Sequence, residues 1–153
     1  MDAIDLKLLD LLQRQGDRQV ADLAAEVGLS TTPCWRRIQR LKETGVITSN
    51  VMLLDRHKVN VGVTVFVSIR TNKHTDAWFR KLRATVEAIP EVVEFYRMSG
   101  DVDYLLRVVV PDIAAYDRVY KRLTAGTDIA DLSSSFAMEE IKFTTALPLT
   151  YTP

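Results

Sequence analysis

The spacing of hydrophobic residues changes once along this chain, and that change constrains the fold more than any other feature of the sequence. Up to about residue 47, apolar residues recur at helical intervals, as Ile4, Leu8, Leu11 and Leu12 do at i, i+4, i+7 and i+8. From residue 61 they alternate with other residues, as strands do, in a first run of Val63, Val65, Val67 and Ile69. The 153 residues therefore predict a small helical domain followed by a domain that contains a sheet.

Turn-forming residues divide the helical part into three helices. The first ends near Gly16, and the second ends at Gly28, which can adopt the left-handed conformation of a helix C-terminus. Ser30 is a good N-cap for the third helix, whose expected inward face is Cys34, Ile38 and Leu41. Two helices joined by a tight turn that contains glycine predict a helix-turn-helix domain, here of the three-helix, winged type.

The rest of the chain predicts the element order βαββαβ. We expect strands over 61–70, 92–98 and 104–110, helices over 75–88 and 112–123, and a last strand or strand pair within 129–141. This order is the split βαβ arrangement of ferredoxin-like domains. The predicted fold is therefore α+β, with a helix-turn-helix domain over 1–48, a tether strand over 49–60 and a ferredoxin-like domain over 61–153.

Positive charge is concentrated on one segment of a chain whose net charge is zero. Residues 1–29 carry three basic and six acidic side chains, or −3, while residues 30–58 carry six basic and two acidic ones, or +4. This segment includes the helix after Ser30, which in a helix-turn-helix enters the major groove. The expected DNA-contacting residues are Ser30, Thr31, Thr32, Trp35, Arg36, Arg37, Gln39, Arg40 and Lys42.

Within this set we expect different roles. Thr32, Trp35, Arg36 and Arg40 are predicted to contact bases or the groove, since Arg pairs well with guanine edges, and Arg37 and Lys42 are predicted to contact phosphates. The alternative is a solvated charged face on an ordinary three-helix bundle. For Trp35, packing over the helix pair is an equal alternative. Cys34, on the inward face, is predicted to be a small buried hydrophobic residue.

The expected sheet has one face that its own helices cannot cover. Val65, Phe66 and Val67 are consecutive, so the first strand presents apolar residues to both faces. Two helices can cover only one face of a four-stranded sheet, and the other face, with Phe66 and Phe95, needs a partner. The pattern therefore predicts self-association through the sheet, and an isologous dimer would place two DNA-reading helices about 34 Å apart or at a multiple of that distance.

The chain resembles the Lrp/AsnC (feast/famine) transcriptional regulators over essentially its whole length. Its opening residues, Asp2 to Leu9, are similar to the family pattern D-x-x-D-x-x-I-L, and Asp22 to Ser30 followed by Pro33 to Ile38 is similar to the family's helix-turn-helix. Ser99 to Leu106 resembles the signature G-x-x-D-Y-L-L. Ser49-Asn50 departs from the Gly-containing pair of many members, and Gln19 stands where a small capping residue is commoner.

The resemblance implies a sequence-specific DNA-binding regulator of transcription whose C-terminal domain binds a ligand and assembles. The implied partners are double-stranded promoter DNA, an amino acid or related metabolite as effector, and further copies of the chain, as dimers that form tetramers or octamers. The effector would bind between dimers. No cofactor is implied.

The turn after the predicted second strand of the sheet is chemically suited to an amino acid. Backbone N–H groups around Gly100 can hold a carboxylate, and Asp103, or less favourably Asp101, can hold the ammonium group. The resemblance implies that the last strand of a neighbouring subunit completes the pocket. The expected effector-binding residues are Met98, Gly100, Asp101, Asp103, Tyr104, Ser133 and Ser135. The alternatives are a tight hairpin whose Asp residues satisfy turn amides and a plain edge strand kept soluble by hydroxyl groups.

Other classes of protein find little support in the sequence. His57 and His74 are isolated, so no metal site is expected, and no phosphate-binding glycine loop or Ser-His-Asp set suggests an enzyme. A metabolite-binding module without DNA binding would leave residues 1–47 without a purpose. We expect no membrane span, no signal peptide and, with Cys34 as the sole cysteine, no intrachain disulfide, which together favour a cytoplasmic protein.

Overall fold

A computed structural model describes residues 1–152 and divides the chain into two compact units. The N-terminal unit comprises Met1–Leu53 together with the segment from Lys142 onward, and the C-terminal unit comprises Leu54–Ile141. The structure thus groups the residues from Lys142 onward with the N-terminal unit, unlike the predicted division at 61–153. The physical reason is a pair of hydrogen bonds of 2.9 Å, in which the Gln13 side-chain amide both donates to the Leu147 carbonyl and accepts from the Leu147 N–H.

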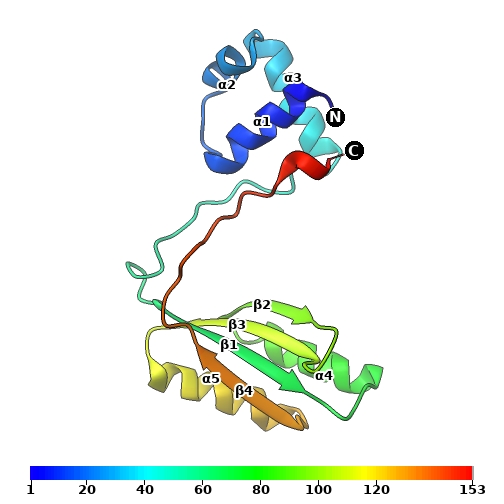
Figure 1. The fold of residues 1–153 in the computed structure, drawn as a ribbon, viewed down its shortest axis with the longest axis vertical. Coiled ribbons are helices and arrows are strands. Elements are labelled where there is room, and N and C mark those ends of the chain that lie inside the picture. The colour runs from blue at the N-terminus through cyan, green and yellow to red at the C-terminus, as the bar shows by residue number, and fades with distance from the viewer. Residues whose placement is uncertain (153) are drawn as a thin grey trace. The chain divides into compact units, whose positions relative to one another are not determined.

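The N-terminal unit contains α1 (Ala3–Arg14), α2 (Val20–Val27), α3 (Thr31–Glu43) and the short 3-10 helix η1 (Leu149–Tyr151) (Figure 1). α1 begins with a capping box, in which the side chain of Asp2 accepts from the Asp5 N–H and the side chain of Asp5 accepts from the Asp2 N–H. The inward faces meet in one core of Leu8, Leu23, Ala24, Cys34 and Ile38. The helical periodicity thus predicted these three helices correctly, and Cys34 is buried as expected.

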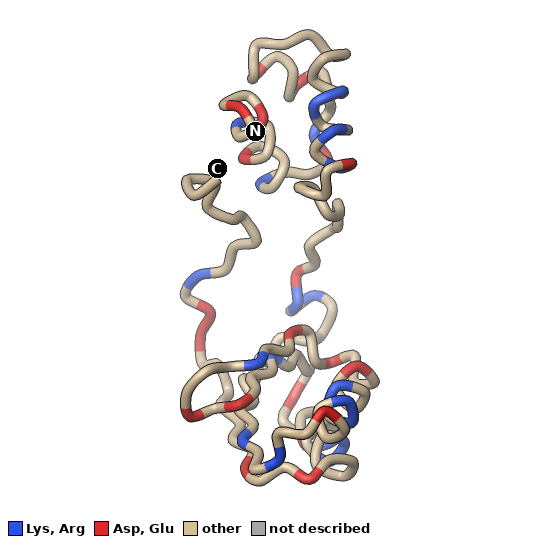
Figure 2. Tube along the Cα trace, turned by 90° about the vertical axis from the view of Figure 1, so that its right-hand side faces the viewer, with Lys and Arg blue, Asp and Glu red and all other residues tan. Residues whose placement is uncertain are grey.

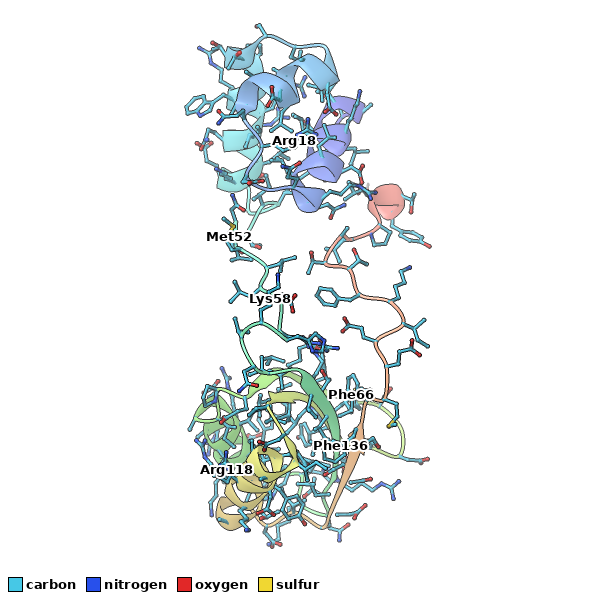
Figure 3. All side chains as sticks on the ribbon, turned by 90° about the vertical axis from the view of Figure 1, so that its left-hand side faces the viewer. Arg18, Met52, Lys58, Phe66, Arg118 and Phe136 are labelled. Atoms are coloured by element: carbon cyan, nitrogen blue, oxygen red, sulfur yellow. The ribbon has the colours of Figure 1, made fainter. Side chains whose placement is uncertain are left out.

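The prediction of a tether strand over 49–60 is wrong. Among the described residues, no strand lies between α3 and β1. The apolar run Val51–Leu54 stays exposed, as Met52 illustrates in Figure 3, because no neighbouring strand pairs with it. Asp55 then turns the chain by accepting the backbone N–H of His57 at 2.9 Å, which interrupts an extended conformation.

The C-terminal unit has the predicted order βαββαβ: β1 (Val63–Arg70), α4 (Asp76–Glu87), β2 (Val92–Arg97), β3 (Tyr104–Val110), α5 (Ile113–Gly126) and β4 (Asp131–Phe136). The strands form one antiparallel sheet in the order β2-β3-β1-β4, the ferredoxin-like arrangement. Both helices pack on the same face (Figure 1), where Leu82 of α4 and Val119 of α5 join Val67 and Leu106 in the core. None of the helices described up to residue 152 is long and apolar enough to cross a membrane.

The other face of the sheet carries no helix of this unit. Phe66 belongs to this open face and is 39% exposed (Figure 3), in line with the expectation. Phe95 does not belong to it: this ring packs against the core under α4. The reason is an irregularity between Val92 and Glu94, which adds a residue to β2 and reverses its alternation, so that Tyr96 faces outward instead.

Candidate nucleic-acid interface and ligand site

The turn before α3 presents the N-terminus of that helix. α2 ends at Gly28, whose φ of 70° is left-handed, and the next N–H, of Leu29, donates to the Ala24 carbonyl at 2.9 Å. α3 follows Ser30, whose side chain makes no capping hydrogen bond to the described residues. The Ser30 hydroxyl and the first-turn N–H groups can therefore receive an anion, as the N-termini of helices often do.

Basic residues recur along α3 (Figure 2), and the exposed residues of this helix are mainly polar. The exposed members of the predicted set are Ser30, Thr31, Thr32, Trp35, Arg36, Arg40 and Lys42, while Gln39 is half-buried. Trp35 is 50% exposed, so its indole is not packed into the helix pair. The side chain of Arg36 takes part in no hydrogen bond or ion pair within residues 1–152, which leaves its guanidinium group free.

Arg37 and Arg40, in contrast, are held by carboxylates of α1 and its cap. Arg37 Nη1 lies 2.6 Å from Asp2 Oδ2 and 2.8 Å from Asp5 Oδ1. Arg40 Nη2 lies 2.7 Å from the second oxygen of Asp5, Oδ2. Sequence patterns did not predict Asp2 and Asp5 as partners of the third helix, although their D-x-x-D spacing is a signal of a helix start. The two guanidinium groups are therefore not free in the way that Arg36 is.

The ionisation of Asp5 is maintained by these partners. Burial raises the pKa of this carboxyl, but hydrogen bonds from Arg37 and from the Asp2 backbone outweigh burial and hold the pKa below its ordinary value. The pKa of Asp2 is lowered as well, first by its hydrogen bond from the Asp5 backbone and then by Arg37. Both carboxylates are therefore charged at neutral pH, and with the two guanidinium groups they form a cluster whose formal charges sum to zero.

The turn between β2 and β3 has two features that suit a ligand and one that does not. Gly100 adopts a φ of 104°, and Asp101 is exposed. Asp103, the residue predicted to hold an ammonium group, accepts the backbone N–H of Thr71 at 2.8 Å through Oδ2. This hydrogen bond fits the alternative interpretation, in which Asp103 satisfies a backbone amide of a turn. The bond occupies one of the two carboxylate oxygens of Asp103.

Tyr104 lies largely within the core. The ring is 5% exposed and packs against Trp78, Phe79 and Phe95, with ring centroids 5.7 to 5.8 Å apart. The expectation that Tyr104 contacts an effector finds no support in this position. Met98, one strand away, is 42% exposed and accessible.

The two candidate serines of β4 share the open face of the sheet. Ser133 pairs with Ser68 and Ser135 with Phe66, whereas Ser134 faces the helices and hydrogen-bonds with Tyr116. β1 lies between β4 and β3. Within one chain, β1 therefore separates the serines from the turn at Gly100.

A shallow hollow lies between α4 and β2. It measures about 170 Å³ and is lined by Phe79, Arg83, Glu87, Phe95, Arg97 and Tyr104. Ligand pockets are usually larger, at roughly 300 Å³ or more, so this hollow is not a complete site for a small molecule. No group of three metal-ligating side chains is assembled within residues 1–152, and His57 and His74 lie apart from any such set.

Comparison with known proteins identifies both halves of the chain. Residues 1–42 match the AsnC-type helix-turn-helix domain, and residues 64–147 match the Lrp/AsnC ligand-binding domain. The chain is 46% identical to the DNA-binding transcriptional activator DecR of Escherichia coli over 150 residues, which is 97% of this chain and 99% of that protein. These relatives are regulators of transcription, not enzymes.

Solved structures agree over the full length. The crystal structure of an AsnC family transcriptional regulator from Agrobacterium tumefaciens has a TM-score of 0.96 and 63% identity, with 100% of each chain covered. The complex of transcriptional regulator NMB0573 from Neisseria meningitidis with L-Met has a TM-score of 0.93 and 32% identity, covering 98% of this chain and 97% of that one.

Proposed function

The chain belongs to the Lrp/AsnC family of transcriptional regulators, and from that premise we propose that it binds promoter DNA sequence-specifically through α3 and adjusts this binding to an amino acid effector. The exposed outward side of α3, with an unpaired Arg36 beside a half-exposed Trp35, is the observation that carries the first part. Thr31, Thr32 and Gln39 add groups that can reach base edges or phosphates.

An amino acid is the ligand class that the turn at Gly100 fits best. Backbone N–H groups near a glycine at positive φ suit a carboxylate, and Asp103 keeps one oxygen that is not used by Thr71 for an ammonium group. The related regulator NMB0573 was solved with L-Met, which supports the same class of ligand here. Because Ser133 and Ser135 are separated from this turn by β1, we place the effector between dimers, with the serines supplied by a neighbouring subunit.

Assembly through the open face of the sheet completes the proposal. Phe66, Val93 and Tyr96 are between 39% and 50% exposed, and Glu94 and Arg107 form an ion pair on this face. A second copy in an isologous dimer would cover these side chains and bring two DNA-binding units to one operator. Further association of dimers would create the effector sites. Since its partner is promoter DNA, we propose the cytoplasm as the location.

DNA binding is tested by a matched pair of substitutions that remove one positive charge each. Arg36→Ala should weaken binding to an operator selected from a random pool by about 5- to 150-fold, as loss of a base contact does, and leave the melting temperature unchanged. Arg118→Ala, an exposed arginine of α5, is the control and should change neither (Figure 3). Equal effects of the two substitutions, or a collapse of stability in Arg36→Ala, would count against α3 as the reading helix.

The effector is tested with Asp103→Asn, because an asparagine oxygen can still accept the Thr71 N–H while the charge is lost. A melting-shift screen of the twenty amino acids should first identify a ligand that stabilises the wild-type protein. In Asp103→Asn that stabilisation, and the effect of the ligand on operator binding, should disappear while operator binding itself remains. An unchanged ligand response would remove Asp103 from the site.

A further inference from the structure

The two aspartates of the D-x-x-D segment at the start of the chain form ion pairs with two arginines of α3. Asp5 is 1% exposed, and each of its oxygens holds one guanidinium group: Oδ1 takes Arg37 at 2.8 Å and Oδ2 takes Arg40 at 2.7 Å. Oδ2 also accepts the Asp2 N–H at 3.2 Å, and Asp2 Oδ2 takes Arg37 at 2.6 Å. The cluster thus ties the N-terminus of α1 to the middle of α3.

These arginines are the ones that would otherwise add to phosphate binding. Arg37 and Arg40 stand three residues apart and so lie on the same side of α3, next to Arg36. A guanidinium N–H group that donates to a carboxylate cannot donate to a phosphate at the same time. The buried Asp5 would be left as an uncompensated charge if both arginines turned away, which opposes their release.

The carboxylates hold the two arginines with different firmness. The Arg37 side chain is 26% exposed and has two carboxylate partners, so it is the more firmly held. The Arg40 side chain is 57% exposed and has Asp5 as its single ion-pair partner among the described residues. Arg40 can therefore move to a phosphate when other contacts already hold α3 in the groove. In a non-specific complex, Arg40 stays paired with Asp5.

We propose that Asp5 is a specificity-determining positioning residue, which keeps Arg37 and Arg40 away from the phosphates of non-cognate DNA. Non-specific binding comes almost entirely from phosphate contacts, so neutralising two arginines within the protein weakens it selectively. Specific binding also draws on base contacts by Arg36 and its neighbours and is weakened less. The inference rests on the proposed DNA binding through α3.

The test compares Asp5→Asn with Asp10→Asn in the full chain. Both remove one negative charge from α1, but Asp10 pairs with Arg14 on the same helix at 2.9 Å, whereas Asp5 pairs with arginines of α3. Affinities are measured at 50 and 200 mM salt for a selected operator and for a scrambled duplex of the same composition. With a slope of about 0.9 per phosphate contact, each newly freed arginine should increase the loss of affinity over this range by about 3.5-fold.

Asp5→Asn should therefore bind the scrambled duplex more tightly at 50 mM salt, lose more affinity at 200 mM, and show a smaller ratio of operator to scrambled affinity. Asp10→Asn should match the wild type in salt slope. The double variant Asp5→Asn with Arg40→Gln should lower the slope again by the contribution of one phosphate contact, because Arg40, one of the two cations that Asp5 holds, has been removed. Asp2→Asn, at a more exposed position, should reproduce the change in part if Asp5→Asn folds poorly.

A merely structural role for Asp5 would give a different pattern. Both duplexes would then be bound more weakly, with the salt slope unchanged, and this result would overturn the inference. Equal slopes for Asp5→Asn and Asp10→Asn would do the same, because total charge alone would explain the data. If the wild-type protein binds neither duplex, the proposed function fails first, and that outcome is recognisable without any variant.

Discussion

The two units of this protein hold their functional surfaces in place by different means. In the C-terminal unit an extensive apolar core, including the fully buried Val67, Leu82, Leu106 and Leu123, fixes the sheet, and polar groups are left for the open face. In the N-terminal unit the core is small, and the cluster of Asp2, Asp5, Arg37 and Arg40 connects α1 to α3 at its margin. A small unit with little apolar area to bury relies on charged contacts to orient its working helix.

The largest expected effect is on the apolar core of the C-terminal unit. Leu106→Ala should destabilise this unit by about 2–5 kcal/mol, through lost burial and the cavity left behind. Chemical unfolding can follow it, because the chain has two tryptophans, the buried Trp78 of this unit and the half-exposed Trp35 of the other. In a Trp35→Phe background, Leu106→Ala should shift the midpoint of the unfolding transition seen by Trp78 fluorescence to a lower denaturant concentration. If the amide signals of α1–α3 show the same shift in midpoint, the two units unfold together, and the distinction between them is contradicted.

Removal of an aromatic ring from the open face should affect assembly more than folding. Phe66→Thr keeps a good strand former but loses about 1.5 kcal/mol of apolar burial per copy, so the dissociation constant of a dimer should rise on the order of a hundredfold. Ile113→Thr, at a 71% exposed position of α5, is the control. Light scattering and sedimentation measure both. A wild-type monomer at micromolar concentration, or equal dimers in both variants, would contradict assembly through this face.

Acid should destabilise the N-terminal unit more than the C-terminal unit. In the N-terminal unit, four carboxyls have a pKa below the ordinary value: Asp2, Asp5, Asp10 and Glu26. In the C-terminal unit the same is true of two, Glu94 and Asp128. A carboxyl whose folded pKa is lowered contributes stability above its ordinary pKa and loses it as pH falls through the folded pKa. The loss should therefore begin near the ordinary pKa values, 4.5 for Glu26 and 3.8 for the Asp residues, and continue below them. Amide NMR spectra recorded from pH 6 to 2.5 report the folded fraction of each unit separately. Asp5→Asn should make the stability of the N-terminal unit less dependent on pH.

The smallest effects concern helix caps. In the C-terminal unit the Asp112 side chain accepts the Ala115 N–H at 2.7 Å, so Asp112→Ala should cost about 1 kcal/mol. Ser30 makes no such bond, so Ser30→Ala should change stability by less than about 0.5 kcal/mol and instead weaken operator binding. Equilibrium unfolding and operator titration separate the two outcomes. A Ser30→Ala variant as destabilised as Asp112→Ala would mean that this cap serves folding.

Local patterns predicted the elements because their causes are local. The helical spacing of Leu8 and Leu11, the left-handed Gly28 and the alternation from Val63 each act within a few residues, and α1–α5 and β1–β4 follow from them. The same patterns placed Phe95 on the wrong face, because one irregularity near Val92 reverses the alternation of β2 without a clear mark in the sequence. A tether strand was expected over 49–60 because apolar character alone does not supply a pairing partner.

The order of the elements, the position of the reading helix and the residue types on its surface follow from the sequence alone, since each depends on neighbours along the chain. Which of those residues are free to bind follows from the tertiary structure. Arg37 and Arg40 meet carboxylates 32 to 35 positions away, Asp103 is engaged by Thr71, and Tyr104 is enclosed by rings from α4 and β2. Ion pairs and burial depend on distance in space, and the fold alone brings these groups together.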